Sequence, residues 1–346
     1  MNHHKDQMNE QKKNIAFTIC SNNYLAQANI LKESFLQFNP NFSFYICLTD
    51  KFSSEINYKL FEPAIIVPVE KVNGLHVPEL TKKYDVVEFN TCVKPTFIKY
   101  LIDQNKNTEL LYFIDPDICF YQSIDKLNEL LRTRSIVLTP HITKPIVVDE
   151  YLPSEHLFLN YGIYNLGFIG LNLKDPEVKV MLDWWEQKTL NLGYNRTEDG
   201  LFVDQLWMNL TPVYFKNVHV LKDLSYNMAP WNLQERSIKK ILENGEVILN
   251  DDSKLAFYHF SNLDTQRLEI SRFYKRYQFR DLPLLKELYD AYFKRLDGQN
   301  YEQLRKIKNA FTLVKKESET EQKKDSILKR IVLKCARTLE SLAKGL

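Results

Sequence analysis

The chain has 346 residues, of which 44% are apolar and 26% are charged, so it is long and apolar enough for one large globular domain with appendages. No window approaches 18 uninterrupted apolar residues, which argues against a transmembrane helix, and no glycine-rich phosphate-binding stretch stands out among the 9 glycines. The net charge of +2 is uneven, because residues 301–346 hold 12 Lys and Arg against 6 Asp and Glu; the slightly acidic body carries no nucleic-acid-binding motif, which argues against a nucleic-acid partner.

The first third of the chain alternates short apolar runs with segments of helical spacing. A polar leader, residues 1–13, is expected to be disordered. Helical spacing predicts a helix over 24–38, which Pro40 ends, and another within 88–102, which begins near Pro95. The apolar runs predict strands at Asn14–Cys20, Phe42–Leu48, 64–69 and Leu110–Ile114.

The rest of the chain continues this alternation and then becomes helical. The pattern predicts a strand over 162–171, helices over 177–189 and 201–210, and a late strand over 257–260. From Pro283 onward the spacing is helical. These predictions divide the chain into a main α/β domain at 14–282, a helical extension at 283–316 packed on or near that domain, and a linker with a basic amphipathic helix at 317–346.

Alternating strands and helices with apolar strands favour a doubly wound, mainly parallel sheet covered by helices. In such sheets, ligands bind outside the carboxyl ends of the strands. Two polar clusters fall at this edge: residues 21–24 follow the first predicted strand, and Asp115-Pro116-Asp117 follows the fourth.

The paired carboxylates of Asp115 and Asp117 offer hard oxygen ligands that suit Mg²⁺ or Mn²⁺, either of which can bridge the phosphates of a substrate. The same pattern also occurs as a simple turn. A phosphatase of the haloacid-dehalogenase type is a chemical alternative, but its motif ends in Thr or Val where this chain has Cys119.

Further clusters follow the carboxylate pair in a characteristic order: 164–172, then Asp204-Gln205, then 258–261. With residues 21–24 in front, this order resembles the GT-A glycosyltransferases, specifically the retaining enzymes of glycosyltransferase family 8 and related bacterial enzymes. The resemblance spans about residues 15–263. It implies a GT-A catalytic domain at 14–282 with a Rossmann-like nucleotide-binding half.

The resemblance also implies roles for individual residues. Asp115, Asp117 and His259 match the metal ligands. The nucleotide base and ribose would be gripped by Ser21, Asn23 and Tyr24, and Lys94 stands where relatives place a basic residue near the donor. The residues that match those beside the donor sugar, close to its anomeric carbon, are Asn165, Asp204 and Gln205.

The chain departs from the family pattern after His259, where a diphosphate-binding lysine is missing and residues 261–264 read Ser-Asn-Leu-Asp. Arg267 or Arg272 are the candidate substitutes. Each predicted site residue also has a structural alternative: His259 as a core histidine, Asp204 in a salt bridge, Asn165 in a turn, Lys94 covering a helix start. Trp231 either fills the core or, in its polar loop, forms a platform for a sugar.

The sequence therefore predicts a metal-dependent glycosyltransferase that uses Mn²⁺ or Mg²⁺. The resemblance implies that it moves a hexose from a nucleotide-diphosphate sugar, UDP-linked, to a glycan or lipid-linked acceptor with retention of configuration. Two alternatives stay open: a metal-dependent phosphohydrolase or nucleotidyltransferase, and a carbohydrate-binding protein without catalytic activity.

Five scattered cysteines and the lack of a secretory signal in the leader predict reduced thiols and a cytoplasmic location. The basic amphipathic pattern of residues 325–346 allows peripheral contact with the inner face of a membrane, as in bacterial surface glycan assembly. The same helix could instead pack on the body or on another subunit.

Overall fold

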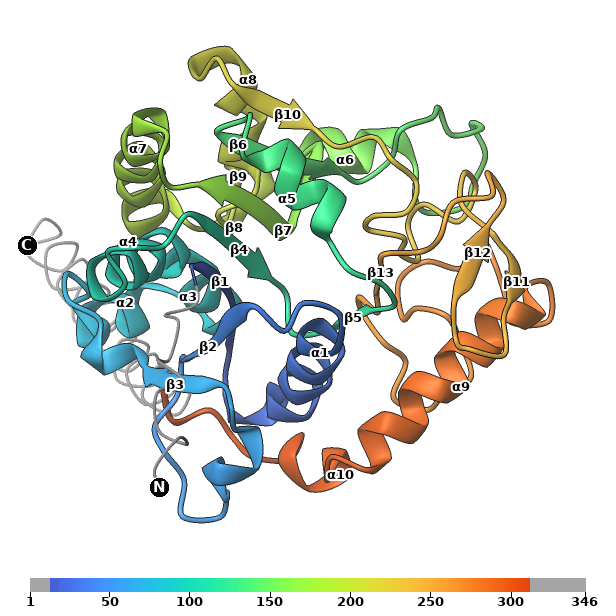
Figure 1. The fold of residues 1–346 in the computed structure, drawn as a ribbon, viewed down its shortest axis with the longest axis horizontal. Helices are drawn as coiled ribbons and strands as arrows, with labels where there is room; N and C mark the ends of the chain where they lie inside the picture. The colour runs from blue at the N-terminus through green and yellow to red at the C-terminus, as the bar shows by residue number, and fades with distance from the viewer. Residues whose placement is uncertain (1–12, 312–346) are drawn as a thin grey trace, which may run out of the picture.

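A seven-stranded sheet forms the centre of the computed structural model, which describes residues 13–311 (Figure 1). Its strand order is β10-β6-β7-β4-β1-β2-β3. Only β7 runs antiparallel to its neighbours, β4 and β6, while the other pairs are parallel. The mainly parallel α/β fold predicted from the sequence is confirmed. The strands are β1 (Asn14–Cys20), β2 (Phe42–Leu48), β3 (Ile65–Pro68), β4 (Leu110–Ile114), β6 (Ile136–Pro140), β7 (Tyr164–Asn172) and β10 (Val218–Val220).

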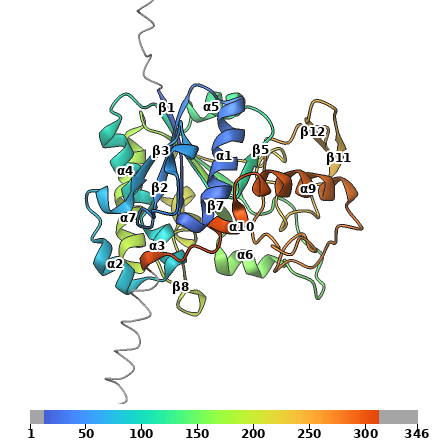
Figure 2. The same ribbon diagram turned by 90° about the horizontal axis from the view of Figure 1, so that it is seen from below.

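Helices cover both faces of this sheet (Figure 2). One face carries α1 (Leu25–Phe38) and α5 (Asp125–Leu131), and α9 (Pro283–Asp297) joins the same hydrophobic core from outside by packing against α1. The opposite face carries α2 (Val77–Lys83), α3 (Val86–Cys92), α4 (Lys94–Gln104) and α7 (Pro176–Leu192). Because side chains alternate along a strand, Tyr112 of β4 packs in the first layer and Leu111 and Phe113 pack in the second. The sheet is therefore buried on both sides, which explains its continuous apolar strands.

Short two-stranded pairs lie outside the central sheet. β5 (Ile118–Phe120) pairs antiparallel with β13 (Phe257–His259), β8 (Asn195–Arg196) pairs with β9 (Leu201–Phe202), and β11 (Ile238–Ile241) pairs with β12 (Val247–Leu249). Two further helices are α6 (Glu155–Tyr161) and α8 (Thr211–Tyr214). The β5–β13 pair matters most for the site, because it brings a segment from late in the chain beside the exit of β4.

The predicted helix over 201–210 is wrong. Residues 201–202 form β9, and a short 3₁₀ helix follows at Leu206–Leu210. Between them, Val203 has a φ of 41°, and the side chains of Asp204 and Gln205 are buried among polar partners. These tertiary contacts override the helical spacing of the apolar residues.

The extension after α9 turns back onto the main domain. α9 and α10 (Tyr301–Leu304) pack against α1, and residues 307–311, here called the return segment, then run to the carboxyl edge of the sheet. Within the described residues, no helix is both long and apolar enough to span a bilayer. The predicted linker and basic helix at 317–346, and nearly all of the predicted leader, lie outside the described residues.

Candidate active site at the carboxyl edge of the sheet

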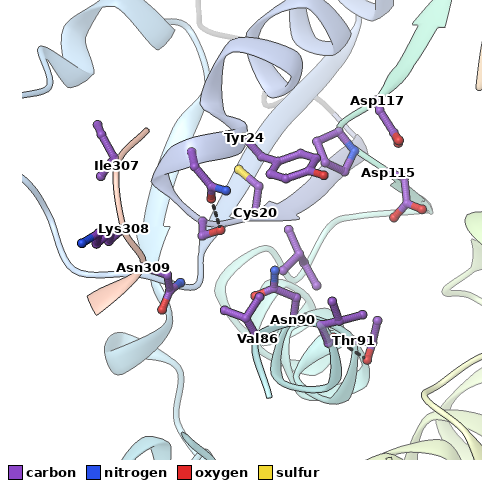
Figure 3. Close-up of a pocket in the computed structure, with 15 residues that line it drawn as sticks. Cys20, Tyr24, Val86, Asn90, Thr91, Asp115, Asp117, Ile307, Lys308 and Asn309 are labelled. Atoms are coloured by element: carbon purple, nitrogen blue, oxygen red, sulfur yellow. Dashed lines mark hydrogen bonds between the residues drawn. The ribbon is translucent and has the colours of Figure 1, made fainter. Parts of the chain in front are cut away.

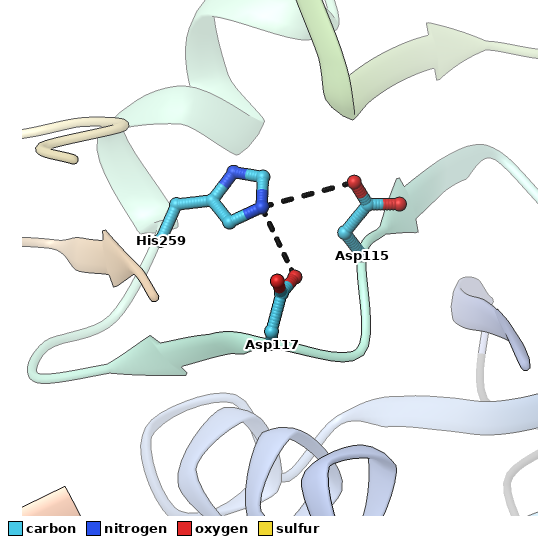
Figure 4. A group of neighbouring side chains, drawn as sticks. All are labelled: Asp115, Asp117 and His259. Carbon is cyan, nitrogen blue, oxygen red and sulfur yellow. Dashed lines mark ion pairs between the residues drawn. The ribbon is translucent and has the colours of Figure 1, made fainter. Parts of the chain in front are cut away.

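Two carboxylates and one imidazole converge where β4 leaves the sheet (Figure 4). Asp115 and Asp117 follow β4 in a turn, and the Asp115 backbone N–H donates to the carbonyl of Gly167 on β7 at 2.7 Å. His259 arrives from β13, whose pairing with β5 sets it opposite Ile118. The Nε2 atom of His259 lies 3.0 Å from Asp117 Oδ1 and 3.8 Å from Asp115 Oδ2. The structure thus brings together the three predicted metal ligands.

The His259 ring is held in one orientation by its neighbours. Its Nδ1 lies 3.3 Å from Asn165 Oδ1, which can only accept a hydrogen bond, so Nδ1 carries the proton and Nε2 faces the carboxylates. The Asn165 backbone carbonyl accepts from the Thr139 hydroxyl at 3.2 Å. The Trp231 ring meets the imidazole edge-on at 5.1 Å and is buried, so Trp231 fills the interior beside His259, as the first of its two alternatives held, and does not form a sugar platform.

Gly167 leaves the space into which these groups point. A Cβ atom at this position would lie 2.5 Å from His259 Cε1, 2.7 Å from Asp115 Oδ2 and 2.9 Å from Asn165 Oδ1. No real side chain tolerates such distances, so the close approach of three polar groups requires glycine here. The signal for this was present in the sequence as Asn165-Leu166-Gly167, but only the fold shows what the glycine avoids.

The close approach of the three groups shifts the pKa values of Asp115 and His259. The pKa of Asp115 is raised to about 6, chiefly because its carboxyl is withdrawn from water, while Lys94 and His259 oppose the rise. Burial lowers the pKa of His259, but the carboxylates of Asp117 and Asp115 outweigh burial and raise it. Two oxygen ligands and one nitrogen ligand, all with ligand atoms within 4.8 Å of one another, fit a divalent ion such as Mn²⁺.

A buried ion pair lies beneath this cluster. Lys94 Nζ is 2.6 Å from Asp204 Oδ2, and the two side chains are 3% and 2% exposed, so both charges are shielded from water. Lys94 also donates to the carbonyl of Leu166 at 3.0 Å and lies over the ring of Phe113. Burial raises the pKa of Asp204, and Lys94 opposes this. Lys94 therefore sits inside the domain, where it does more than cover the start of α4.

The Gln205 side chain is bound at both ends. Its Oε1 accepts from the Leu166 backbone N–H at 2.9 Å, and its Nε2 donates to the Tyr161 carbonyl at 2.7 Å. Gln205 therefore fixes the start of β7 to the end of α6. Together with Lys94 and Asp204, it anchors the short strand segment that carries Asn165.

A cavity of about 480 Å³ opens beside the carboxylates and is here called the donor cavity (Figure 3). Its lining comes from four separate segments: residues within 19–24 after β1, within 86–91 of α3, 115–117 after β4, and 307–309 of the return segment. The predicted nucleotide-binding residues Ser21, Asn23 and Tyr24 all line it. Ser21 Oγ donates to Asn23 Oδ1 at 2.6 Å, which fixes these two side chains to each other.

Two walls of the donor cavity were not predicted from the sequence. Asn90 and its neighbours on α3 form one, and residues 307–309 form the other. A capping box between Asp85 and Glu88 marks the start of α3 and could have located this helix in the sequence. No local pattern signals that residues 307–309 return to the site, because the contact joins segments far apart in the chain.

The two candidate replacements for the missing lysine differ in their surroundings. Arg267 is bound to Asp297 in a bidentate ion pair on the surface. Arg272 lines a smaller cavity of about 150 Å³ that is also lined by Asn23, Tyr24 and Asp117, so it lies next to the cluster of Asp115, Asp117 and His259. Arg272 is the arginine whose charge can reach a ligand there.

No family model matches the chain. Two proteins of Bacillus subtilis (strain 168) are similar to it in sequence. The uncharacterized protein YfnF is 27% identical over 275 residues, which cover 79% of this chain and 89% of YfnF. The uncharacterized protein YfnD is 23% identical over 284 residues, which cover 81% of this chain and 87% of YfnD.

Among solved structures, the chain is similar to the galactosyltransferase LgtC in complex with donor and acceptor sugar analogs, at 14% identity and a TM-score of 0.48. That match covers 72% of this chain and 87% of LgtC. Mouse xyloside xylosyltransferase 1 is 14% identical at a TM-score of 0.42, covering 72% of this chain and 98% of that protein.

Proposed function

We propose that the protein is a metal-dependent glycosyltransferase that moves a hexose from a nucleotide-diphosphate sugar, UDP-linked, to a glycan or lipid-linked acceptor with retention. One observation carries this proposal: the cluster of Asp115, Asp117 and His259 stands at the rim of a cavity large enough for a nucleotide. Metal ligands beside such a cavity suit the chemistry of a departing diphosphate.

The three ligands would hold Mn²⁺ or Mg²⁺, and the bound ion would stabilise the negative charge of the leaving diphosphate. The His259 nitrogen favours Mn²⁺ over a purely oxygen-binding ion. Asn165 keeps Nε2 of His259 directed at the ion, and Gly167 keeps the space free. Arg272 would add a second positive charge on the Asp117 side of the cluster.

The donor sugar is assigned to the side of the cluster that Asn165, Asp204 and Gln205 support. A carboxylate or amide oxygen there would stabilise the positive charge that develops on the sugar ring. Asp204 is buried and already paired with Lys94, so covalent attack by its carboxylate would first require that pair to break. This favours same-face attack by the acceptor, which also retains configuration, over a covalent intermediate.

The test is an assay that separates the possible products. The full chain is incubated with Mn²⁺, a panel of nucleotide sugars and candidate acceptors, and free nucleoside diphosphate and inorganic phosphate are measured separately. We expect nucleoside diphosphate to be released in step with sugar transfer. Release of phosphate or pyrophosphate without transfer would indicate a phosphohydrolase or nucleotidyltransferase, and binding without turnover would indicate a carbohydrate-binding protein.

Asp115→Ala is the matching variant. Removing a metal ligand is expected to lower transfer by about 1000-fold while the protein stays folded, because the ion supplies several kcal/mol of charge stabilisation. Asp103→Ala is the control, since Asp103 is an exposed carboxylate on α4 that pairs with Lys106. Full activity of Asp115→Ala would refute the metal role.

A further inference from the structure

The end of the donor cavity that lies away from the metal cluster has no role in the proposal above. Figure 3 shows Asp115 and Asp117 on one side of the cavity and residues 307–309 on the opposite side, with Asn90 of α3 between them. If a diphosphate binds at the metal cluster, the nucleoside attached to it has to extend toward this far end. The chemistry of the far end therefore bears on which nucleoside fits.

The return segment is fixed in place at this end by three contacts. Asn309 Nδ2 donates to the Thr49 carbonyl at 3.0 Å, and the Ala310 backbone N–H donates to Asp50 Oδ1 at 2.9 Å. The Phe311 ring packs edge-on against Phe89 of α3 at 5.7 Å. Because Thr49 and Asp50 directly follow β2, the return segment is attached to the same sheet edge that carries the rest of the site. It is a built wall of the cavity.

Asn90 brings a side-chain amide to this end of the cavity, beside apolar side chains of the lining. Ile19, Val86 and Ile307 line the cavity around it, and its side-chain oxygen is buried without a hydrogen-bond partner among residues 13–311. An unpaired buried amide oxygen is costly, and a ligand that pairs with the amide recovers this cost. The next residue, Thr91, offers no such capacity, since its hydroxyl donates to the carbonyls of its own helix.

A side-chain amide presents one hydrogen-bond donor group and one acceptor side by side. Its complement is a planar edge that also carries an adjacent donor and acceptor, as the edge of uracil does. The flanking aliphatic side chains suit the faces of a flat ring. Ser21 and Asn23 line the same cavity and are bonded to each other, and in this arrangement they would face the ribose.

We propose that Asn90 and the return segment residues Ile307–Asn309 form the nucleobase subsite of the donor cavity. Asn90 reads the hydrogen-bonding edge of the base, and the return segment closes the subsite. This inference rests on the proposed function, because it takes the ligand to be a nucleoside diphosphate whose phosphates lie at the metal cluster. It makes the helical extension a part of the binding site.

The test compares ligands with and without a base. Binding of UDP, CDP, GDP, ADP and inorganic pyrophosphate, each with Mn²⁺, is measured by calorimetry on the full chain. The wild type is expected to bind UDP more tightly than pyrophosphate. Asn90→Leu is expected to weaken UDP about tenfold and to leave pyrophosphate unchanged, because only the base pairs with the amide.

Two further variants complete the design. Asn191→Leu is the matched control and is expected to change neither ligand, because Asn191 is exposed on α7, outside the donor cavity, and its amide donates to the Gln187 carbonyl. Asn90→Asp keeps the size of the side chain but removes its donor, so it should also weaken UDP and shift the order of preference among the four nucleotides. If Asn90→Leu does not fold, Asn90→Asp decides the matter.

The outcomes separate the two proposals. A wild type that binds UDP, combined with Asn90 variants that bind UDP equally well, would overturn the nucleobase subsite and leave the donor function standing. Equal weakening of UDP and pyrophosphate would overturn it as well, because the effect would then not act through the base. If the wild type binds neither ligand with Mn²⁺, the proposed function fails and this inference fails with it.

Discussion

The two ends of the donor cavity are built in different ways. At the proposed metal end, Asp115, Asp117 and His259 lie on strands or directly after them, and hydrogen bonds fix two of the three: Asn165 binds His259, and the Asp115 N–H binds the Gly167 carbonyl. At the far end, a helix and a returning chain segment face each other, and three contacts hold the return segment. The end proposed to bind the metal thus uses strand ends and a dense polar network, whereas the end proposed to bind the base uses an appended segment.

The largest expected effect comes from removing the buried ion pair of Lys94 and Asp204 next to the metal end. Lys94→Met leaves the Asp204 carboxylate buried without its partner, so we expect the free energy of unfolding to fall by about 3–5 kcal/mol. Urea unfolding followed by circular dichroism measures the loss. Lys106→Met removes a lysine from an exposed pair and should change stability by less than about 1 kcal/mol. Equal effects of the two variants would contradict the importance of burial.

The second prediction concerns the packing beside the metal end. His141 stacks on Phe158 and meets Trp231, and burial lowers its pKa from 6.5 to about 4, although a hydrogen bond to the Ile163 carbonyl opposes this. Between these pH values the unfolded chain binds the proton and the folded protein does not. The free energy of unfolding should therefore fall as the pH drops from 6.5 to 4, by up to about 3 kcal/mol.

Urea titrations at several pH values measure this slope for the wild type and for His141→Gln. The variant lacks the titrating ring and should lose the corresponding part of the slope. An unchanged slope in His141→Gln would show that other groups cause the acid sensitivity.

The third prediction concerns the space that Gly167 leaves at the metal end. Gly167→Ala places a methyl group against His259 and Asp115, so the affinity for Mn²⁺ should fall by about 100-fold. Gly170→Ala is the matched control on the same strand: its methyl group would meet Tyr112 and cost stability, but should leave the Mn²⁺ affinity of the folded protein unchanged. Calorimetric titration with Mn²⁺ distinguishes the two, and similar losses in both would point to a general distortion of β7.

The fourth prediction concerns Arg272, which lies on the Asp117 side of the cluster. Arg272→Ala should weaken UDP binding by about tenfold in the presence of Mn²⁺, because a charged hydrogen bond to phosphate is lost. Arg267→Ala should have little effect, since Arg267 is bound to Asp297 on the surface. Calorimetry with UDP tests both, and the idea fails if Arg267 proves the more important residue.

The metal end could be predicted from the sequence because its signals are local. The strand β4 runs straight into Asp115-Pro116-Asp117, and the apolar residues around His259 predicted the late strand that carries it. The order of these motifs along the chain supplied the remaining link. The glycines of 162–171 indicated a closely packed strand, but the sequence did not show which polar side chains approach Gly167, because His259 and Asp115 come from other parts of the chain.

The far end could not be predicted because its contacts join distant segments. Asn309 meets Thr49, and Phe311 meets Phe89, although more than 200 residues separate the members of each pair. The helix predicted over 201–210 failed for a related reason: the pairing of Asp204 with Lys94 and the two backbone bonds of Gln205 determine that segment more than its apolar spacing does.

The edge-on contact between Trp231 and His259 has a practical consequence. Indole emission is sensitive to a neighbouring positive charge and is quenched by a paramagnetic ion. The protein thus carries an optical reporter in contact with the imidazole that would bind the ion. Binding of Mn²⁺ to the site could therefore be followed by the tryptophan fluorescence of the unlabelled protein during a titration. The Trp231→Phe variant would give the contribution of the other tryptophans.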